Sequence, residues 1–130
     1  MGFFMEFDST NNILRVTLEG PVTDATLSGA YAAAAGYVVL HGPCRGVVDL
    51  SKVTKFEVST TLIQEQAEGA SAFPNGYLRI FVAPTNFLYG MARMFELLCQ
   101  ENRPDLRVVR TMDEAHHLLR VESPEFVAVS

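Results

Sequence analysis

Apolar and polar positions alternate near the start of the sequence in a pattern that predicts a β-hairpin. Residues 3–7 and 13–19 form two apolar, β-prone runs, and residues 8–12 between them are mostly turn formers. In the second run apolar and polar side chains alternate with a period of two, which is typical of a strand with one face in solvent. We therefore expect two paired strands in this part of the chain.

The pattern changes to a helical period after this hairpin. Thr23 or Asp24 is placed to cap a helix, which is expected to end near Gly36 or at residues 42–43. Three later apolar runs are short, bounded by turn residues and followed by helical spacing, so they predict parallel strands that alternate with helices. These strands are expected over residues 46–50, 77–83 and 106–110, and the helices that follow them begin near Ser59, Asn86 and Thr111.

The predicted order of elements is therefore β-β-α-β-α-β-α-β-α. Alternation of this kind predicts an α/β fold, in which a single layer of mixed, mostly parallel β-sheet carries about four helices. Residues 51–58 are expected to link a strand to a helix. The longest helix, over residues 86–102, is expected to pack through one apolar face, made of Phe87, Met91, Met94, Phe95 and Leu98.

Length and composition favour a single domain. The 130 residues predict one domain over 1–130, with its core in about residues 3–120 and a tail over 121–130. Hydrophobic residues make up 48% of the chain and charged residues 19%, so a substantial core can be buried. The net charge of −5 disfavours nonspecific binding of nucleic acid.

The same sequence predicts a cytoplasmic protein without a transmembrane segment. The longest nearly unbroken apolar run, residues 30–40, is well short of the ~20 residues that span a bilayer. The first residues lack the cationic region and the apolar stretch of a secretion signal. Cys44 and Cys99 are too few for a disulfide framework and fit a reducing compartment.

Three stretches carry a resemblance to a known family. The segment GVVDLSKVTKFEVS at residues 46–59 resembles the strand-loop-helix of STAS domains, and FLYGMARMFE at residues 87–96 is similar to a helix typical of their SpoIIAA-like branch. Residues 113–115 fit the same branch, and the resemblance covers roughly residues 5–119. It implies a single STAS-like domain without enzymatic activity. Some members of the wider group are anti-anti-sigma factors switched by serine phosphorylation, and others are regulatory modules on transporters or sensors.

The resemblance also implies a phospho-acceptor-like position at Ser59. The family motif Asp-Ser-Ser-Gly falls on Glu57, Val58, Ser59 and Thr60, so the acid and the acceptor are kept. Val58 and Thr60 depart from the motif, and Thr60 would crowd a partner or kinase backbone that glycine lets approach. Ser59 is otherwise an ordinary N-cap hydroxyl, which is the interpretation that we favour.

A rim of polar residues is the predicted location for any ligand or partner. The N-termini of the last three helices are expected at the edge where parallel strands end, and their free N–H groups favour an anion. Asp49 follows a predicted parallel strand, where it is either a functional acid or bonds the next loop. Arg93 is either an anion contact or the partner of Glu96 in a surface ion pair. The candidate rim consists of Asp49, Glu57, Ser59, Thr60, Asn86, Tyr89, Arg93 and Thr111.

The motifs of catalysis, metal binding and cofactor binding are missing from the sequence. No Gly-x-Ser-x-Gly motif and no glycine-rich phosphate loop occurs, and neither cysteine follows a helix-start signal. A structural zinc site needs four convergent ligands, and the spacing of the few soft ligands does not supply them. We therefore expect no catalytic residue, no metal and no cofactor. The soft ligands are His41, Cys44, Cys99, His116 and His117.

Taken together, these patterns predict a non-enzymatic binding or regulatory module for a small or lipid-like ligand, anionic ones included, or for a protein partner. The alternative is an anti-sigma factor antagonist switched at Ser59, and a weaker alternative is a small hydrolase. A buried apolar cavity would favour the first function, an exposed Ser59 the second, and a Ser or Cys within hydrogen-bond reach of a His the third. The apolar residues 3–5, at a predicted sheet edge, also predict a homodimer or weak self-association.

Overall fold

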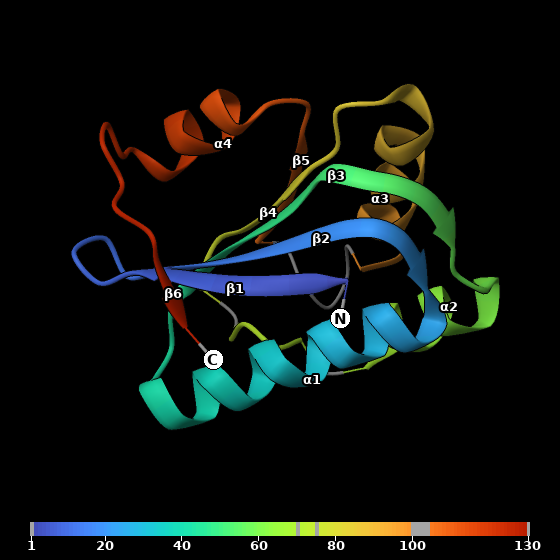
Figure 1. Cartoon of the computed structure of the whole chain (residues 1–130), viewed down its shortest axis with the longest axis horizontal. Helices are drawn as coiled ribbons and strands as arrows, with labels where there is room; N and C mark the ends of the chain where they lie inside the picture. Colours follow the sequence, from blue (N-terminus) through green and yellow to red (C-terminus); the bar gives the residue numbers. More distant parts are fainter. Residues whose placement is uncertain (1, 70, 75, 100–104, 130) are drawn as a thin grey trace.

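The computed structural model of the chain describes residues 2–69, 71–74, 76–99 and 105–129. These residues form strands and helices around one sheet, as Figure 1 shows. The elements are β1 (Phe3–Asp8), β2 (Ile13–Thr23), α1 (Asp24–His41), β3 (Arg45–Glu57), α2 (Thr60–Glu68), β4 (Arg79–Val82), α3 (Asn86–Cys99), β5 (Leu106–Val109), α4 (Met112–Leu119) and β6 (Val127–Val129).

The described strands form a mixed, six-stranded sheet in the order β5-β4-β3-β2-β1-β6. β2, β3, β4 and β5 run parallel to one another, whereas β1 pairs antiparallel with both β2 and β6. The predicted α/β class, with a mixed and mostly parallel sheet and four helices, is therefore confirmed. The predicted hairpin is formed by β1 and β2, and the buried Asp8 carboxylate accepts hydrogen bonds from the backbone N–H groups of Thr10 and Asn11 in its turn.

The link that we predicted over residues 51–58 is wrong, because β3 continues through this segment to Glu57 and pairs with the second half of β2. The register of this pairing shifts between Thr17 and Glu19 and again between Gly20 and Pro21. The ladder thus continues past Pro21, which cannot donate a hydrogen bond. Most side chains of the segment are exposed, so the apolar pattern by which a buried strand is recognised is missing.

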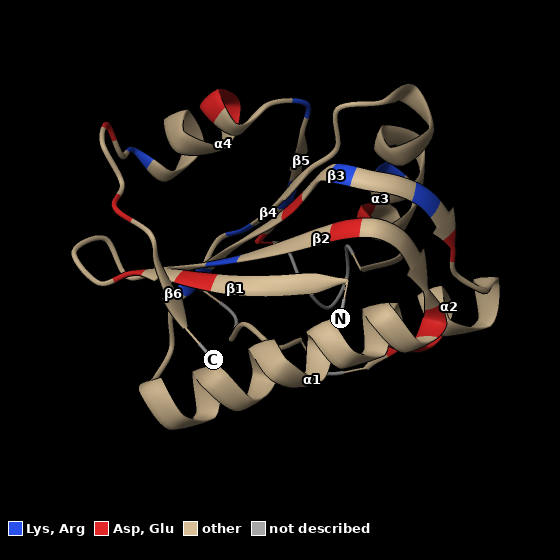
Figure 2. Cartoon of the chain, in the orientation of Figure 1, with Lys and Arg blue, Asp and Glu red and all other residues tan. Residues whose placement is uncertain are grey.

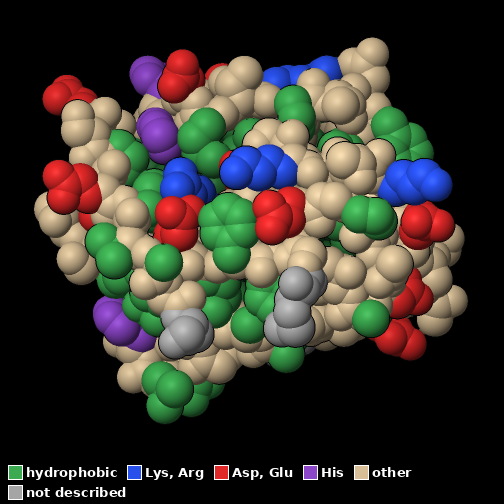
Figure 3. Space-filling view, in the orientation of Figure 1, with side chains coloured by type: hydrophobic (Ala, Val, Ile, Leu, Met, Phe, Trp, Pro, Cys, Tyr) green, Lys and Arg blue, Asp and Glu red, His purple; other side chains and the backbone are tan. Residues whose placement is uncertain are grey.

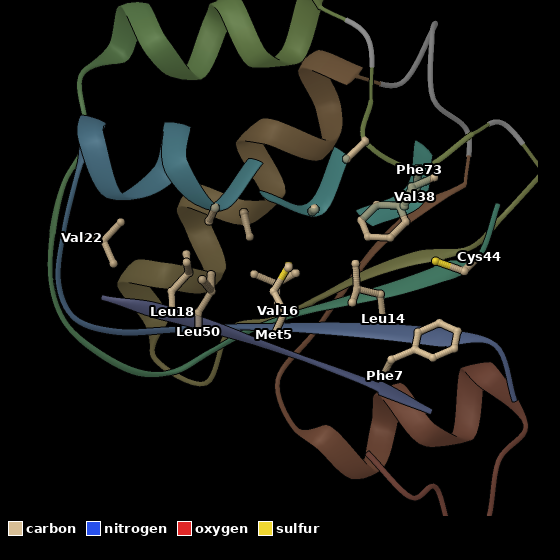
Figure 4. Packing of buried hydrophobic residues seen from close by; sticks show 14 of the residues in the cluster. Met5, Phe7, Leu14, Val16, Leu18, Val22, Val38, Cys44, Leu50 and Phe73 are labelled. Carbon is tan, nitrogen blue, oxygen red and sulfur yellow. The ribbon is translucent and has the colours of Figure 1, made fainter. Parts of the chain in front are cut away.

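Helices cover the two faces of the sheet unequally. α1 and α4 lie on opposite sides of the sheet in Figure 1. Buried side chains of α1 and α3 form one cluster with side chains of β2, and Ala67 of α2 packs with Cys99 of α3. Figure 4 shows Leu14, Val16 and Leu18 pointing from β2 toward this three-helix face. α4 packs alone on the other face, against side chains that include Val47 and Ile80.

The predicted packing face of α3 is wrong in part: Phe95 packs against Phe81 of β4 as expected, whereas Phe87, Met94 and Leu98 are exposed. The buried residues are Leu88, Ala92 and Cys99, whereas Phe87 is 61% exposed and Leu98 is 47% exposed. Both sets recur at helical spacing, so periodicity alone does not choose between them. The small side chain of Ala92 lies inward because it lets the helix approach the sheet. α3 begins at Asn86 as predicted and ends at Cys99, and residues 100–102 of the predicted helix lie outside the described residues.

The predicted tail contains a strand that covers part of a sheet edge. β6 pairs with Met5, Glu6 and Phe7 of β1. The predicted sheet edge at residues 3–5 is therefore wrong in part, because Met5 pairs with Val129 of β6, and its side chain is buried in the core. Self-association stays a prediction. Exposed apolar side chains that could serve it include Phe4 of β1, Leu40 of α1 and Phe87 of α3.

Candidate functional site

Two adjoining apolar cavities lie between the sheet and helices α1, α2 and α3, and each has a volume of about 70 Å³. A water molecule needs about 10–15 Å³ on this measure, so the two compartments together have room for roughly ten non-hydrogen atoms. α1 and residues 71–74 border the first compartment, and α2 and α3 border the second. Their lining overlaps in six residues, Leu18, Leu27, Val48, Gln66, Phe81 and Phe95.

Small side chains on the helices leave this space unfilled. Ala30 and Ala34 of α1 line the first compartment and Ala92 of α3 lines the second, and all three are buried. Phe81 of β4 stacks on Phe95 of α3 between the two compartments, with 5.6 Å between ring centroids and 13° between ring planes. Because alanines face these rings, the helices pack on the sheet without filling the volume between them.

The ring of Phe73 lines the first compartment and rests on Gly46 of β3. A Cβ atom at Gly46 would lie 2.3 Å from Cζ of Phe73, which is closer than real Cβ atoms approach a neighbour. Phe73 is 4% exposed, and Figure 4 shows its ring beside Val38 of α1. The missing side chain at Gly46 therefore provides the seat for this ring.

One charged residue, Arg79 of β4, lines the first compartment among the described residues. Arg79 is 7% exposed, and its Nη1 donates a hydrogen bond to Oγ of Ser71 at 3.1 Å. The guanidinium carbon lies 5.4 Å from the ring centroid of Phe81 and 5.8 Å from that of Phe95. Both distances are within the range of cation–π attraction, so the two rings and Ser71 fix the position of the cation. Gln66 adds an amide to the lining of both compartments.

The first group of predicted rim residues surrounds the N-terminus of α2. Ser59 is the exposed N-cap, and its Oγ accepts a hydrogen bond from the backbone N–H of Leu62 at 3.1 Å. The backbone N–H of Ser59 donates to Oδ1 of Asp24 in α1 at 2.7 Å. Glu57 and Thr60 flank Ser59 and are exposed. The N-cap interpretation of Ser59 is thus confirmed, and an acid of α1 lies beside it.

The second group lies where α3 and α4 begin. Nη1 of Arg110 donates to Oδ1 of Asn86 at 2.8 Å, and its guanidinium carbon lies 4.3 Å from the ring centroid of Tyr89. Thr111 is the N-cap of α4, and its Oγ accepts a hydrogen bond from the backbone N–H of Glu114. Asn86, Tyr89 and Thr111 are therefore brought together around a cation, Arg110, that was not predicted.

The contacts that two other rim residues make with described residues are local. Asp49 lies within β3 rather than at its end, which corrects the predicted position, and its Oδ1 accepts hydrogen bonds from the backbone N–H and Oγ of Ser51. Arg93 forms an exposed ion pair with Glu96 one turn along α3. Both local contacts were predicted, and a role of either residue in binding a ligand stays a prediction.

Cysteine and histidine side chains form no metal centre among the described residues. Both cysteines are buried free thiols, and burial raises the pKa of the Cys44 thiol, which lowers its thiolate fraction. The ring of His41 lies against the rings of Phe7 and Tyr37. Within the described ranges, no group of three or more His, Cys, Asp or Glu side chains could hold a metal ion.

Charges are mixed on the surface around β1, β2 and β3. Figure 3 shows acidic and basic side chains next to one another on this side, and Figure 2 marks acidic and basic positions on the same strands. Arg15 pairs with Glu6 at 2.7 Å. In contrast, α1 carries few titratable side chains, because its 18 residues include one acid, Asp24, and one histidine, His41. In Figure 2 this helix is therefore almost entirely tan. None of the described helices is both long and apolar enough to cross a membrane.

Sequence reasoning missed the cavity and Arg79. A signal for Arg79 was present, because it is the single charged residue in the predicted strand over residues 77–83. A charge in an otherwise apolar strand needs a buried partner or a function. The cavity itself left no local signal, since it depends on which side chains from six separate elements face one another.

Comparison with known proteins adds no family. A scan against models of protein families finds no match, and a search of curated proteins finds no match either. The STAS resemblance of residues 46–59 and 87–96 therefore stays a prediction. The function has to be argued from the site.

Proposed function

We propose that this domain is a non-enzymatic, STAS-like binding module, whose ligand is a small and largely apolar molecule held between the sheet and helices α1, α2 and α3. The observation that carries the proposal is the two-compartment apolar cavity. Protein interiors are normally packed with few voids larger than a water molecule. An apolar cavity of about 150 Å³ is enough to bind benzene, and small-molecule sites are typically apolar with a few polar groups.

The segments that carry the STAS resemblance also border this cavity. Residues 46–59 form most of β3 and the cap of α2, and residues 87–96 lie within α3. Val48, Leu50 and Met91 from these segments line the second compartment. The segments with the STAS resemblance therefore contribute side chains to the proposed ligand site.

Cavity filling tests the proposal. Ala34→Leu places a larger side chain in the first compartment, and Ala32→Leu on the exposed side of α1 is the matched control. We expect calorimetry to show saturable binding of 1-octanol to the wild type and to Ala32→Leu. Affinity for Ala34→Leu should be at least about tenfold lower. Absence of saturable binding to the wild type, or equal affinity of both variants, would refute the proposal.

The non-enzymatic part has its own test. The raised pKa of Cys44 disfavours a thiolate nucleophile, and Ser59 uses its hydroxyl oxygen to cap a helix. We expect no turnover in broad esterase and phosphatase screens. Turnover that disappears in Cys44→Ala or Ser59→Ala would favour the hydrolase alternative.

The exposure of Ser59 favours a second candidate function, an anti-sigma factor antagonist switched by phosphorylation. The hydroxyl is accessible at a helix N-terminus, where the dipole would stabilise a phosphate. However, the carboxylate of Asp24, which accepts the backbone N–H of Ser59, would lie close to the added charge. Stoichiometric phosphate on Ser59 in protein from its native cells, measured by mass spectrometry, would favour the switch over the binding module.

A further inference from the structure

We infer that Gln66 of α2 is the polar contact of the cavity, and that the ligand is an uncharged medium-chain alcohol whose hydroxyl lies at Gln66. This inference rests on the proposed function and adds the chemical class of the ligand and the place of its polar end. It starts from the position of one uncharged amide where the two mainly apolar compartments adjoin.

The helical spacing of α2 places Gln66 on the inner side of this helix. Ile63 and Ala67 are the buried residues of α2, and positions 63, 66 and 67 share one face of a helix. Gln66 itself is partly buried and lines both compartments. A ligand in either compartment therefore lies beside Gln66.

Hydrogen bonding distinguishes Gln66 from the other polar side chains of the lining. Within the part of the chain that the structure describes, no hydrogen bond joins the Gln66 amide to another residue. In contrast, Tyr31 and Arg79 of the first compartment already have partners. A glutamine amide offers N–H donors and a carbonyl acceptor, so it can either donate a hydrogen bond to a hydroxyl or accept one from it.

The second compartment favours an uncharged ligand with an alkyl chain. Gln66 is the one polar side chain among the described residues that line it, and none of these residues is charged. A carboxylate placed there would lose its hydration without gaining a cation, whereas a hydroxyl can bond the amide. The remaining side chains, which include Phe56, Leu88 and Met91, are apolar and suit a flexible chain. Room for roughly ten non-hydrogen atoms in the two compartments matches an eight-carbon alcohol.

Calorimetry with 1-octanol, octanoate and ethylbenzene at neutral pH separates the hydrogen bond from charge and from apolar burial. We expect the wild type to bind 1-octanol at least about tenfold more tightly than octanoate. Gln66→Met keeps the length of the side chain and removes its amide, so it should weaken 1-octanol binding by about 3- to 10-fold and leave ethylbenzene affinity within about twofold. Gln64→Met, the same change at an exposed position of α2, is the matched control and should alter none of these affinities.

The outcomes distinguish this inference from the proposed function. Saturable 1-octanol binding with equal affinity of the wild type and Gln66→Met would overturn the role of Gln66 and leave the cavity as a purely apolar site. Equal losses of 1-octanol and ethylbenzene affinity in Gln66→Met would also overturn it, because they would show a packing effect. Octanoate that binds the wild type as tightly as 1-octanol would overturn the preference for an uncharged ligand, and this comparison needs no variant. Failure of both 1-octanol and ethylbenzene to bind the wild type would overturn the proposed function itself.

Discussion

Replacing Gly46 by alanine tests the packing that shapes the first compartment. A Cβ atom there would lie 2.3, 2.5 and 2.7 Å from three atoms of the Phe73 ring, whereas carbon atoms in good contact lie about 3.5–4.0 Å apart. The ring is buried and belongs to the core cluster of the three-helix face, so it has no free path into solvent. The methyl group must push the ring toward the cavity or displace β3.

The expected cost follows from two opposing effects. Forcing an extra methyl group into a packed core costs about 1–3 kcal/mol. Replacing glycine also reduces the entropy of the unfolded chain, which returns about 0.4–1 kcal/mol where the backbone suits alanine. Since Gly46 lies in a regular strand, both effects apply, and we expect Gly46→Ala to lower the free energy of unfolding by about 0.5–2.5 kcal/mol.

Urea denaturation followed by circular dichroism measures this cost. Gly36→Ala in α1 is the matched control, because its Cβ would meet nothing within 4 Å, and it should raise the free energy of unfolding by roughly 0.5–1 kcal/mol. In a Phe73→Ala background the penalty of Gly46→Ala should vanish. A penalty that persists there, or a Gly46→Ala variant as stable as Gly36→Ala, would show that the ring does not rest on Gly46.

Three further predictions follow from the same structure. In urea denaturation Phe95→Ala should cost roughly 2–4 kcal/mol and the exposed Phe87→Ala less than about 1 kcal/mol, and equal costs would contradict the packed face of α3. In thermal melts Ser59→Ala should cost about 0.5–2 kcal/mol as a lost cap, and Ser59→Asp should also destabilise unless Asp24 is changed to Asn, since it adds a second carboxylate there. Because burial raises the pKa of Cys44, iodoacetamide at pH 8 should label this thiol far more slowly in the folded than in the urea-unfolded protein, and equal rates would refute its burial.

Local features of the fold were predictable from the sequence. The hairpin, the α/β class and the starts of the helices depend on patterns within a few residues. Ser59 and Thr111 cap helices because hydroxyl side chains satisfy free N–H groups within their own turn. Such signals need no knowledge of the rest of the chain.

Features that depend on distant residues were not predictable in this way. Either stripe of α3 could face the sheet, and the choice is made by how closely Ala92 lets the helix approach. The end of β3 is a strand because the second half of β2 provides five paired positions for it, although its own side chains are mostly exposed. The surroundings of Arg79 were not predictable either, because its guanidinium lies near the rings of Phe81 and Phe95, and Phe95 belongs to another element.

The unfilled cavity lowers the stability of the empty protein, and filling it with side chains would remove the space for the proposed ligand. At roughly 24 cal/mol per Å³ of unfilled volume, each compartment of about 70 Å³ costs the empty protein about 1.5–2 kcal/mol. A bound molecule recovers part of that cost, so the melting temperature should rise with ligand concentration. A mutation that fills the space without strain recovers this free energy in the absence of any ligand. Selection for thermal stability alone would therefore favour more stable variants without the proposed site.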